Sequence, residues 1–128
     1  MRTLLIVDDN PSIRVVLSQC LERKGFHVSS ADSGVEAVTK TEGSNFDAVI
    51  MDINMPQLSG IDACDRILKR DPLPRPLIWL MTGLWSPEVE EAGLRAGAHE
   101  VLAKPFNTEY LLSRLQAGWA HQTSASPA

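Results

Sequence analysis

The stretch LLIVDDNPS, residues 4–12, decides how the chain begins to fold. Its opening run of aliphatic residues, rich in β-branched side chains, is typical of a strand that is buried on both faces. Asn10 and Pro11 then provide a helix N-cap and a first-turn proline. Between strand and helix stand two adjacent carboxylates, Asp8 and Asp9, and two such charges 4 Å apart repel by roughly 4 kcal/mol at an effective dielectric near 20. One acidic residue would serve solubility, so the pair needs a further explanation.

Apolar runs and amphipathic stretches alternate along the rest of the chain. The runs that predict strands are residues 3–7, 26–31, 46–51, 77–81 and 100–103. The helices are expected from Pro11 to Gly25, over 33–40 and 61–68, from Ser86 to Gly97, and from Asn107 onward. Five strands that alternate with helices imply an α/β domain in which a parallel sheet is covered on both faces.

Length, composition and charge narrow the class of protein. The 128 residues fit one domain of common size, and 44% apolar with 22% charged residues is ordinary for a globular protein. We expect this domain over residues 1–120 and a disordered tail or linker stub at 121–128. No apolar run approaches the ~20 residues of a membrane helix, and the N-terminus has no secretory signal, so a cytoplasmic location is the default. A net charge of −4 argues against direct binding of nucleic acid.

Polar side chains follow four of the five predicted strands, at the point where each strand ends. They are Asp8 and Asp9, Asp52, Thr82 and Lys104. In a doubly wound sheet, ligands bind outside the carboxyl ends of the strands, and these ends meet at one edge. Each residue alone has a plainer interpretation, as a helix cap, a turn residue, the start of a loop or a solvated lysine. Their meeting at one edge favours a functional site.

The residue types at this edge suit a cation and a phosphoryl group. Three converging carboxylates repel one another and raise one another's pKa values unless a cation lies between them. Mg²⁺ prefers oxygen ligands and is typically held by one or two carboxylates with a phosphate, and Mn²⁺ is a second candidate. An aspartate can accept the phosphoryl group covalently. Asp8 and Asp9 are therefore predicted to hold a metal, with the ammonium and the hydroxyl on the opposite side.

Four motifs resemble the receiver domain of two-component response regulators, over roughly residues 3–119. They are IVDDNP at 6–11, MDINMPQLSG at 51–60, LMTG at 80–83 and AKPF at 103–106. Their order and separations make the resemblance specific. It implies a flavodoxin-like, doubly wound α/β fold with a five-stranded parallel sheet in the order 2-1-3-4-5 and helices on both faces.

The resemblance implies a role for each acidic residue. Asp52 matches the phosphoacceptor of the family. Asp9 and Asp52 would ligate Mg²⁺ directly, with the backbone carbonyl of Asn54 as a further ligand. Asp8 would act mostly through a metal-bound water.

The resemblance also implies which groups meet the phosphoryl group. Lys104 would pair with the phosphoryl oxygens and help to orient Asp52, and Thr82 would donate its hydroxyl to the bound group. The Lys104–Pro105 peptide bond is expected to be cis. The donor would be a phosphohistidine of a sensor histidine kinase or of a histidine phosphotransfer protein.

The implied role is signalling rather than enzyme action on a separate substrate. The chain would catalyse only its own phosphorylation and slow dephosphorylation. Phosphorylation would repack the surface formed by the fourth helix, the fifth strand and the fifth helix. A C-terminal output domain or a separate partner would read this surface, and the domain itself would contact neither nucleic acid nor a membrane.

Two positions, Val101 and Trp79, depart from the family pattern or are unusual. Val101 stands three positions before Lys104, where receivers commonly carry an aromatic switch residue. We therefore expect the signal to pass through the loop GLWSPE, residues 83–88, with Trp85 as the moving side chain. Trp79 is large for a strand buried on both faces, and we expect it to fill the core beside the third or fourth helix.

Two other functions fit part of the pattern. The sequence DIN at 52–54 faintly resembles the Asp-x-Asp signature of metal-dependent phosphatases with an Asp nucleophile, although the second Asp is replaced by Asn54. A pseudo-receiver that binds partners without being phosphorylated is the other alternative. A receiver would gain one phosphoryl group from acetyl phosphate, a phosphatase would turn over repeatedly, and a scaffold would do neither.

Overall fold

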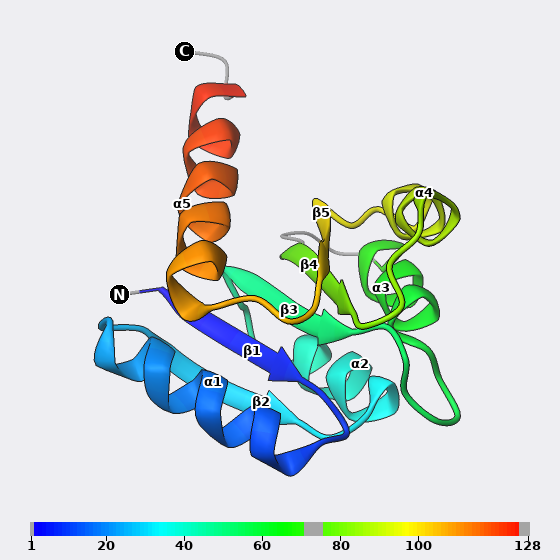
Figure 1. The fold of residues 1–128 in the computed structure, drawn as a ribbon, viewed down its shortest axis with the longest axis horizontal. Helices are drawn as coiled ribbons and strands as arrows, with labels where there is room; N and C mark the ends of the chain where they lie inside the picture. The colour runs from blue at the N-terminus through cyan, green and yellow to red at the C-terminus, as the bar shows by residue number, and fades with distance from the viewer. Residues whose placement is uncertain (1, 71–75, 126–128) are drawn as a thin grey trace.

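Five parallel strands form the centre of the part of the chain that the structure describes, residues 2–70 and 76–125 of a computed structural model (Figure 1). They lie in the order β2-β1-β3-β4-β5, as the resemblance implied. The strands are β1 (Thr3–Val7), β2 (His27–Ala31), β3 (Ala48–Asp52), β4 (Leu77–Thr82) and β5 (Glu100–Ala103).

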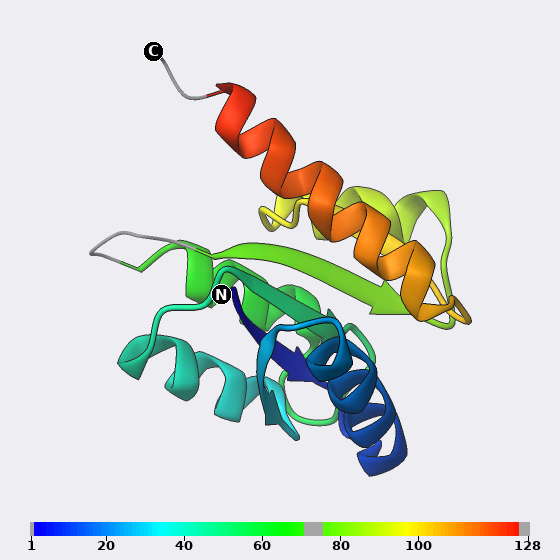
Figure 2. The same cartoon turned by 90° about the vertical axis from the view of Figure 1, so that its left-hand side faces the viewer.

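Helices cover both faces of the sheet, which confirms the predicted α/β class. The helices are α1 (Pro11–Arg23), α2 (Gly34–Gly43), α3 (Gly60–Leu68), α4 (Pro87–Arg95) and α5 (Thr108–Ala125). α1 and α5 lie on one face, and α2, α3 and α4 lie on the other (Figures 1 and 2). Asn10 caps α1 by accepting a hydrogen bond from the backbone N–H of Ser12 at 2.9 Å, as its position before Pro11 predicted.

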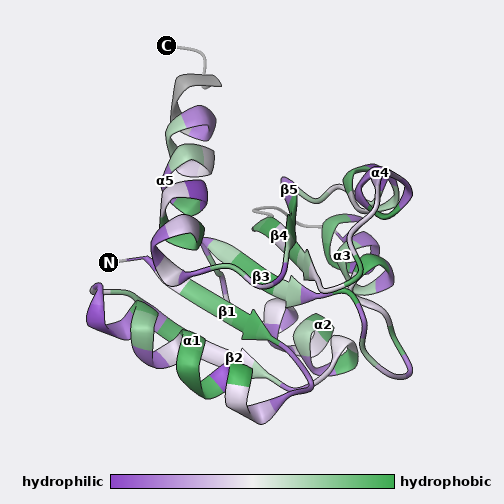
Figure 3. Ribbon diagram, in the orientation of Figure 1, coloured by the Kyte–Doolittle hydropathy of each residue, from purple (hydrophilic) through white to green (hydrophobic). Residues whose placement is uncertain are grey.

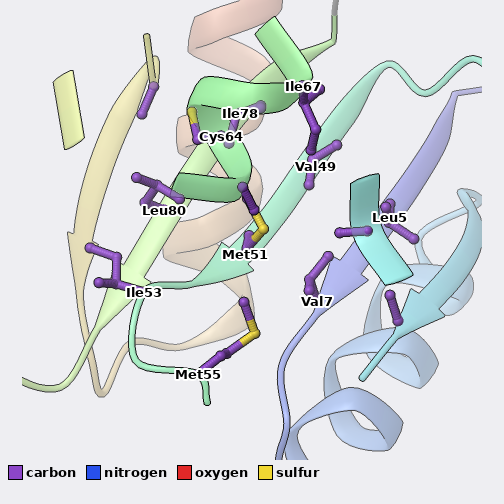
Figure 4. Packing of buried hydrophobic residues seen from close by; sticks show 14 of the residues in the cluster. Leu5, Val7, Val49, Met51, Ile53, Met55, Cys64, Ile67, Ile78 and Leu80 are labelled. Carbon is purple, nitrogen blue, oxygen red and sulfur yellow. The ribbon is translucent and has the colours of Figure 1, made fainter. Parts of the chain in front are cut away.

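The core has two layers because alternate residues of each strand point to opposite faces. Strand residues on the α2–α4 side, such as Leu5, Val49 and Leu80, pack with side chains of those helices (Figure 4). Their neighbours along the strands, such as Ile6 and Ile50, pack against α1 and α5. Strand β1 is hydrophobic along most of its length, whereas hydrophobic and hydrophilic residues alternate along the helices (Figure 3). The near-continuous apolar runs of the sequence are thus explained by burial on both faces.

The expected position of Trp79 is wrong. The side chain is fully buried, but it lies on the α1 and α5 face with Leu115 and Trp119, not beside α3 or α4. Gly118 of α5 leaves room for it, since a Cβ atom there would lie 2.4 Å from Cζ2 of Trp79. A strand buried on both faces gives no periodic signal for which face a large residue takes.

Several element ends differ from the sequence prediction, most of them by one to three residues. β2 and β3 begin at His27 and Ala48, because Phe26 and Phe46 pack on the core from positions just before each strand. Helix α5 continues to Ala125, past the tail boundary expected at residue 120, and its last turns stand clear of the sheet (Figures 1 and 2). Residues 126–128 of the expected tail lie outside the described residues. Over the described part of the chain, no helix has the length and apolar character that crossing a membrane requires.

Candidate functional site

The carboxyl ends of four strands place the predicted residues side by side. Asp8 follows the end of β1, and Asp52 is the last residue of β3 and pairs with Met81 of β4. Thr82 is the last residue of β4, and the backbone N–H of Lys104 donates to its carbonyl at 2.8 Å. The parallel strands therefore bring residues that are far apart in the sequence together in one site.

Three carboxyl groups converge at this edge. Oxygen atoms of Asp8, Asp9 and Asp52 all lie within 4.8 Å of one another. Among residues 2–70 and 76–125, this is the one group of three or more acidic, histidine or cysteine side chains close enough to share a metal ion. Asp8 and Asp52 are buried, whereas Asp9 is exposed and borders solvent. An all-oxygen set that is open on one side suits Mg²⁺, which keeps several of its waters.

Lys104 is the cation that contacts this group. Its Nζ lies 3.0 Å from Oδ2 of Asp8 and 3.3 Å from Oδ1 of Asp52. The Lys104–Pro105 peptide bond is cis, as expected. Burial raises the pKa of Asp52 above its ordinary value, Lys104 opposes this rise, and the nearby charge of Asp8 adds to it. One ammonium does not compensate three carboxyl groups, so the site retains an excess of acidic groups.

The hydroxyl of Thr82 is directed to a neighbouring loop. Oγ1 of Thr82 donates to Oδ1 of Asn54 at 2.8 Å and accepts a hydrogen bond from the backbone N–H of Leu84 at 3.0 Å. Thr82 is 1% exposed, so its hydroxyl depends on these partners. The sequence placed Thr82 at this edge correctly, but it gave no indication that the Asn54 side chain would hold its hydroxyl.

Sequence reasoning missed two groups that shape the site. Gly60, the first residue of α3, lies against the end of β3, because a Cβ atom there would lie 2.2 Å from the carbonyl oxygen of Asp52. Its N–H donates to the carbonyl of Ile53 at 2.9 Å. The glycine at the end of MDINMPQLSG was the available signal. Nη1 of Arg14 donates a hydrogen bond to the backbone carbonyl of Asp8 at 2.7 Å, and nothing in the sequence predicts this contact.

An apolar pocket adjoins Lys104. Its volume is about 350 Å³, and it lies between the first half of α1 and the loop that joins β5 to α5. Ile13, Val16 and Phe106 line it together with Pro105, and Val16 is more than half exposed. The acidic site therefore has an apolar rim on one side.

Comparison with known proteins assigns the chain to a family. The family model of the response regulator receiver domain matches residues 4–116, and the chain belongs to this family. The chain is 38% identical over 115 residues to the response regulator MprA of Mycobacterium sp. (strain KMS). It is 33% identical over 114 residues to the transcriptional regulatory protein TcrA of Mycobacterium tuberculosis. The matches cover 89% of this chain but 49% and 44% of those proteins, so the chain spans about half the length of these relatives.

Solved structures of receiver domains superpose closely on this chain. The chemotaxis response regulator CheY4 of Vibrio cholerae is 36% identical, with a TM-score of 0.85 over 92% of this chain and 98% of that one. The response regulator TrrA of Thermotoga maritima, solved in complex with Mg²⁺ and beryllofluoride, is 33% identical, with a TM-score of 0.79 over 92% and 99%. The chain is a response regulator receiver domain, which is a signalling module, and its acidic cluster fits Mg²⁺.

Proposed function

We propose that Asp52 accepts a phosphoryl group from a phosphohistidine of a sensor histidine kinase or of a histidine phosphotransfer protein. The observation that carries this proposal is the convergence of three carboxyl groups within 4.8 Å of one another, with a single ammonium that contacts two of them. A site built only for stability would balance these charges, because uncompensated buried charge is costly. An excess of carboxylates at the open edge of a sheet instead suits a divalent cation and a ligand that brings its own charge.

The metal would be held by oxygen atoms of this cluster. Asp9 and Asp52 would be direct ligands with the backbone carbonyl of Asn54, and Asp8 would act through a water. Mg²⁺ is the proposed ion, and Mn²⁺ is a second ion that such an oxygen set could take. When bound, the ion would neutralise negative charge on the phosphoryl oxygens.

The transfer itself would use the side chains of Asp52, Lys104 and Thr82. A carboxylate oxygen of Asp52 attacks the phosphorus in line, an O–P bond forms, and the P–N bond to the donor imidazole breaks with its electron pair on nitrogen. Lys104, which is 3.3 Å from Asp52, is near enough to pair with the incoming phosphoryl oxygens. Thr82 then donates its hydroxyl to one of these oxygens. The reaction consumes no water, and later hydrolysis of the aspartyl phosphate resets the site.

The donor would dock over the apolar pocket beside Lys104. The exposed side chain of Val16 lies in the lining of this pocket with Ile13 and Leu17 of α1. A helical surface that carries the phosphohistidine could cover these apolar groups and bring the phosphorus over Asp52. Burial of exposed apolar area would supply part of the binding free energy.

The phosphorylated state would be reported by the surface of α4, β5 and α5. Val101 has no ring that could turn inward, and α4 packs closely on it, since a Cβ atom on Gly93 would lie 2.6 Å from Cγ2 of Val101. We therefore propose that the signal passes through the loop at Trp85, which is 44% exposed. A Trp85 fluorescence signal, isolated by comparison with Trp85→Phe, should change on beryllofluoride binding. An unchanged signal would contradict this route.

The proposed kinase and output partners indicate where the domain lies in its protein and in the cell. Residues 1–120 would form the receiver, and the chain beyond them would lead toward an output domain or leave the surface free for a separate partner. The MprA and TcrA proteins are about twice the length that this chain spans, which supports an output domain as one possibility. Sensor kinases present their phosphohistidine in the cytoplasm, so we place the chain there.

Incubation with acetyl phosphate and Mg²⁺ tests the proposal. One phosphoryl group per chain should appear in the intact mass, and Asp52→Asn should abolish it. Asp47→Asn is the matched control. Asp47 is an exposed aspartate directly before the first residue of β3, whereas Asp52 is the last residue of that strand. Repeated turnover of a phosphomonoester would instead indicate a phosphatase, and absence of label with no turnover would indicate a scaffold. Label that persists on the Asp52→Asn variant would show that another residue is the acceptor.

A further inference from the structure

The hydroxyl of Thr82 has a single proton, and that proton is already in use. Oγ1 donates it to Oδ1 of Asn54 at 2.8 Å, and the 1% exposure of Thr82 leaves little access to water as an alternative partner. A hydroxyl offers one donor and two acceptor sites. The same oxygen accepts the N–H of Leu84 at 3.0 Å, which does not compete for the proton.

A phosphoryl group on Asp52 would need the same proton. Donation to a phosphoryl oxygen requires the Thr82 hydroxyl to leave Asn54, since one proton cannot serve both acceptors at full strength. Asn54 lies two residues after Asp52, so its side chain and the phosphoryl group would approach Thr82 from neighbouring positions. Asn54 is exposed, and its amide can exchange this bond for water at small cost.

We infer that the Asn54 side chain is a positioning residue that holds Thr82 in the unphosphorylated arrangement by competing with the phosphoryl group for the Thr82 proton. This inference rests on the proposed function of Asp52. The Asn54 amide thereby lowers the affinity of the site for a phosphoryl group and sets how much of the domain is active. The backbone carbonyl of Asn54, which would face the metal, takes no part in the competition.

Release of the Thr82 hydroxyl from Asn54 would act directly on the loop of residues 83–88. The N–H of Leu84 is bonded to Oγ1 of Thr82, so a Thr82 side chain that turns toward Asp52 must break this bond or draw the Leu84 backbone with it. Leu84 and Trp85 are exposed and are free to be displaced. The contact with Asn54 therefore controls the same loop that carries the proposed signal.

Beryllofluoride, which mimics the phosphoryl group on an aspartate, provides the test. Its affinity is measured at saturating Mg²⁺ from the backbone amide resonances of Asp9 and Leu84. Asn54→Ala removes the competing acceptor and keeps the backbone carbonyl, so it should tighten beryllofluoride binding by about 2- to 10-fold, the range expected for loss of one hydrogen bond in the unbound state. Asn45→Ala, at an exposed asparagine before β3, is the matched control and should leave the affinity unchanged.

A double-mutant cycle separates competition for the proton from any other effect of the substitution. In a Thr82→Val background, which lacks the hydroxyl, Asn54→Ala should change the affinity by less than about twofold. Tightening that is equal in both backgrounds, or no tightening in the wild-type background, would overturn the inference while leaving Asp52 as the acceptor. Failure of the wild-type chain to bind beryllofluoride at all would overturn the proposed function instead.

Discussion

Two groups of carboxylates meet cations in this molecule, and they are balanced differently. At the carboxyl edge of the sheet, three aspartates lie together, and the ammonium of Lys104 contacts two of them, Asp8 and Asp52. Between β5 and α5, the single carboxylate of Glu100 accepts hydrogen bonds from Nε1 of Trp79 and Nε of Arg114, each at 3.0 Å. The first group has more acceptors than donors, and the second is matched.

This difference in charge balance distinguishes a structural contact from a ligand-binding site. The matched group satisfies a buried indole N–H and connects α5 to the sheet. Its carboxylate is already paired, so it offers no excess charge to a ligand. The group at the sheet edge keeps an excess of carboxyl groups, two of them buried, which costs stability until a cation binds. Perturbed carboxyl groups gather at functional sites for this reason. Removal of a carboxylate should therefore destabilise the fold in the matched group and stabilise it in the group at the sheet edge.

Loss of the matched carboxylate should have the largest effect on stability. Glu100→Ala leaves the indole N–H of Trp79 buried without its acceptor and removes the partner of Arg114, so the free energy of unfolding should fall by roughly 2–3 kcal/mol. Chemical denaturation measures this change. Glu109→Ala is the control, because Glu109 pairs with Lys24 at the surface, and its loss should cost less than about 1 kcal/mol. Equal losses would show that the matched group is not a structural contact.

Loss of the ammonium should cost less and should be recoverable. Lys104→Met leaves Asp8 and Asp52 without their cation, and since Lys104 is 22% exposed we expect a loss of roughly 1–2 kcal/mol in magnesium-free buffer. Addition of Mg²⁺ should recover most of this stability, because the metal ion replaces the missing positive charge. The loss in Glu100→Ala should not respond to Mg²⁺. A Lys104→Met variant that is equally unstable with and without Mg²⁺ would contradict the comparison.

Removal of a carboxylate from the unbalanced group should instead stabilise the fold slightly. Burial raises the pKa of Asp52 above its ordinary value of 3.8, so the ionised form weakens folding at neutral pH. Asp52→Asn should therefore be more stable than the wild type at pH 7 without metal, and its advantage should shrink as the pH falls toward 4. Denaturation midpoints across this range measure the change. An advantage that grows as the pH falls would show that the sign of the pKa shift is wrong.

Much of this arrangement could be predicted from the sequence. Strand ends marked by Asp8, Asp52, Thr82 and Lys104 were sufficient to place four side chains at one edge, because a parallel sheet brings its carboxyl ends together. The Gly25 and Gly97 positions that end α1 and α4 have positive φ angles of 96° and 104°, as helix-ending glycines commonly do.

The parts that could not be predicted are contacts between side chains far apart in the sequence. Trp79 was assigned to the wrong face because both faces of β4 are apolar and periodicity cannot distinguish them. Its bond to Glu100 depends on the register of β4 and β5, in which the two residues are partners, and the space left by Gly118 depends on how α5 crosses the sheet. The bond between Thr82 and Asn54 likewise depends on loop geometry that residue types do not specify.

Calorimetric titration with Mg²⁺ tests the central claim most directly. The account predicts one Mg²⁺ per chain in the wild type and unchanged binding in Glu100→Ala. In Asp9→Asn the affinity should fall by at least about 10-fold, since even outer partners of metal ligands are worth that much. Equal Mg²⁺ affinity in the wild type and in Asp9→Asn would contradict the assignment of the three-aspartate group as the cation site.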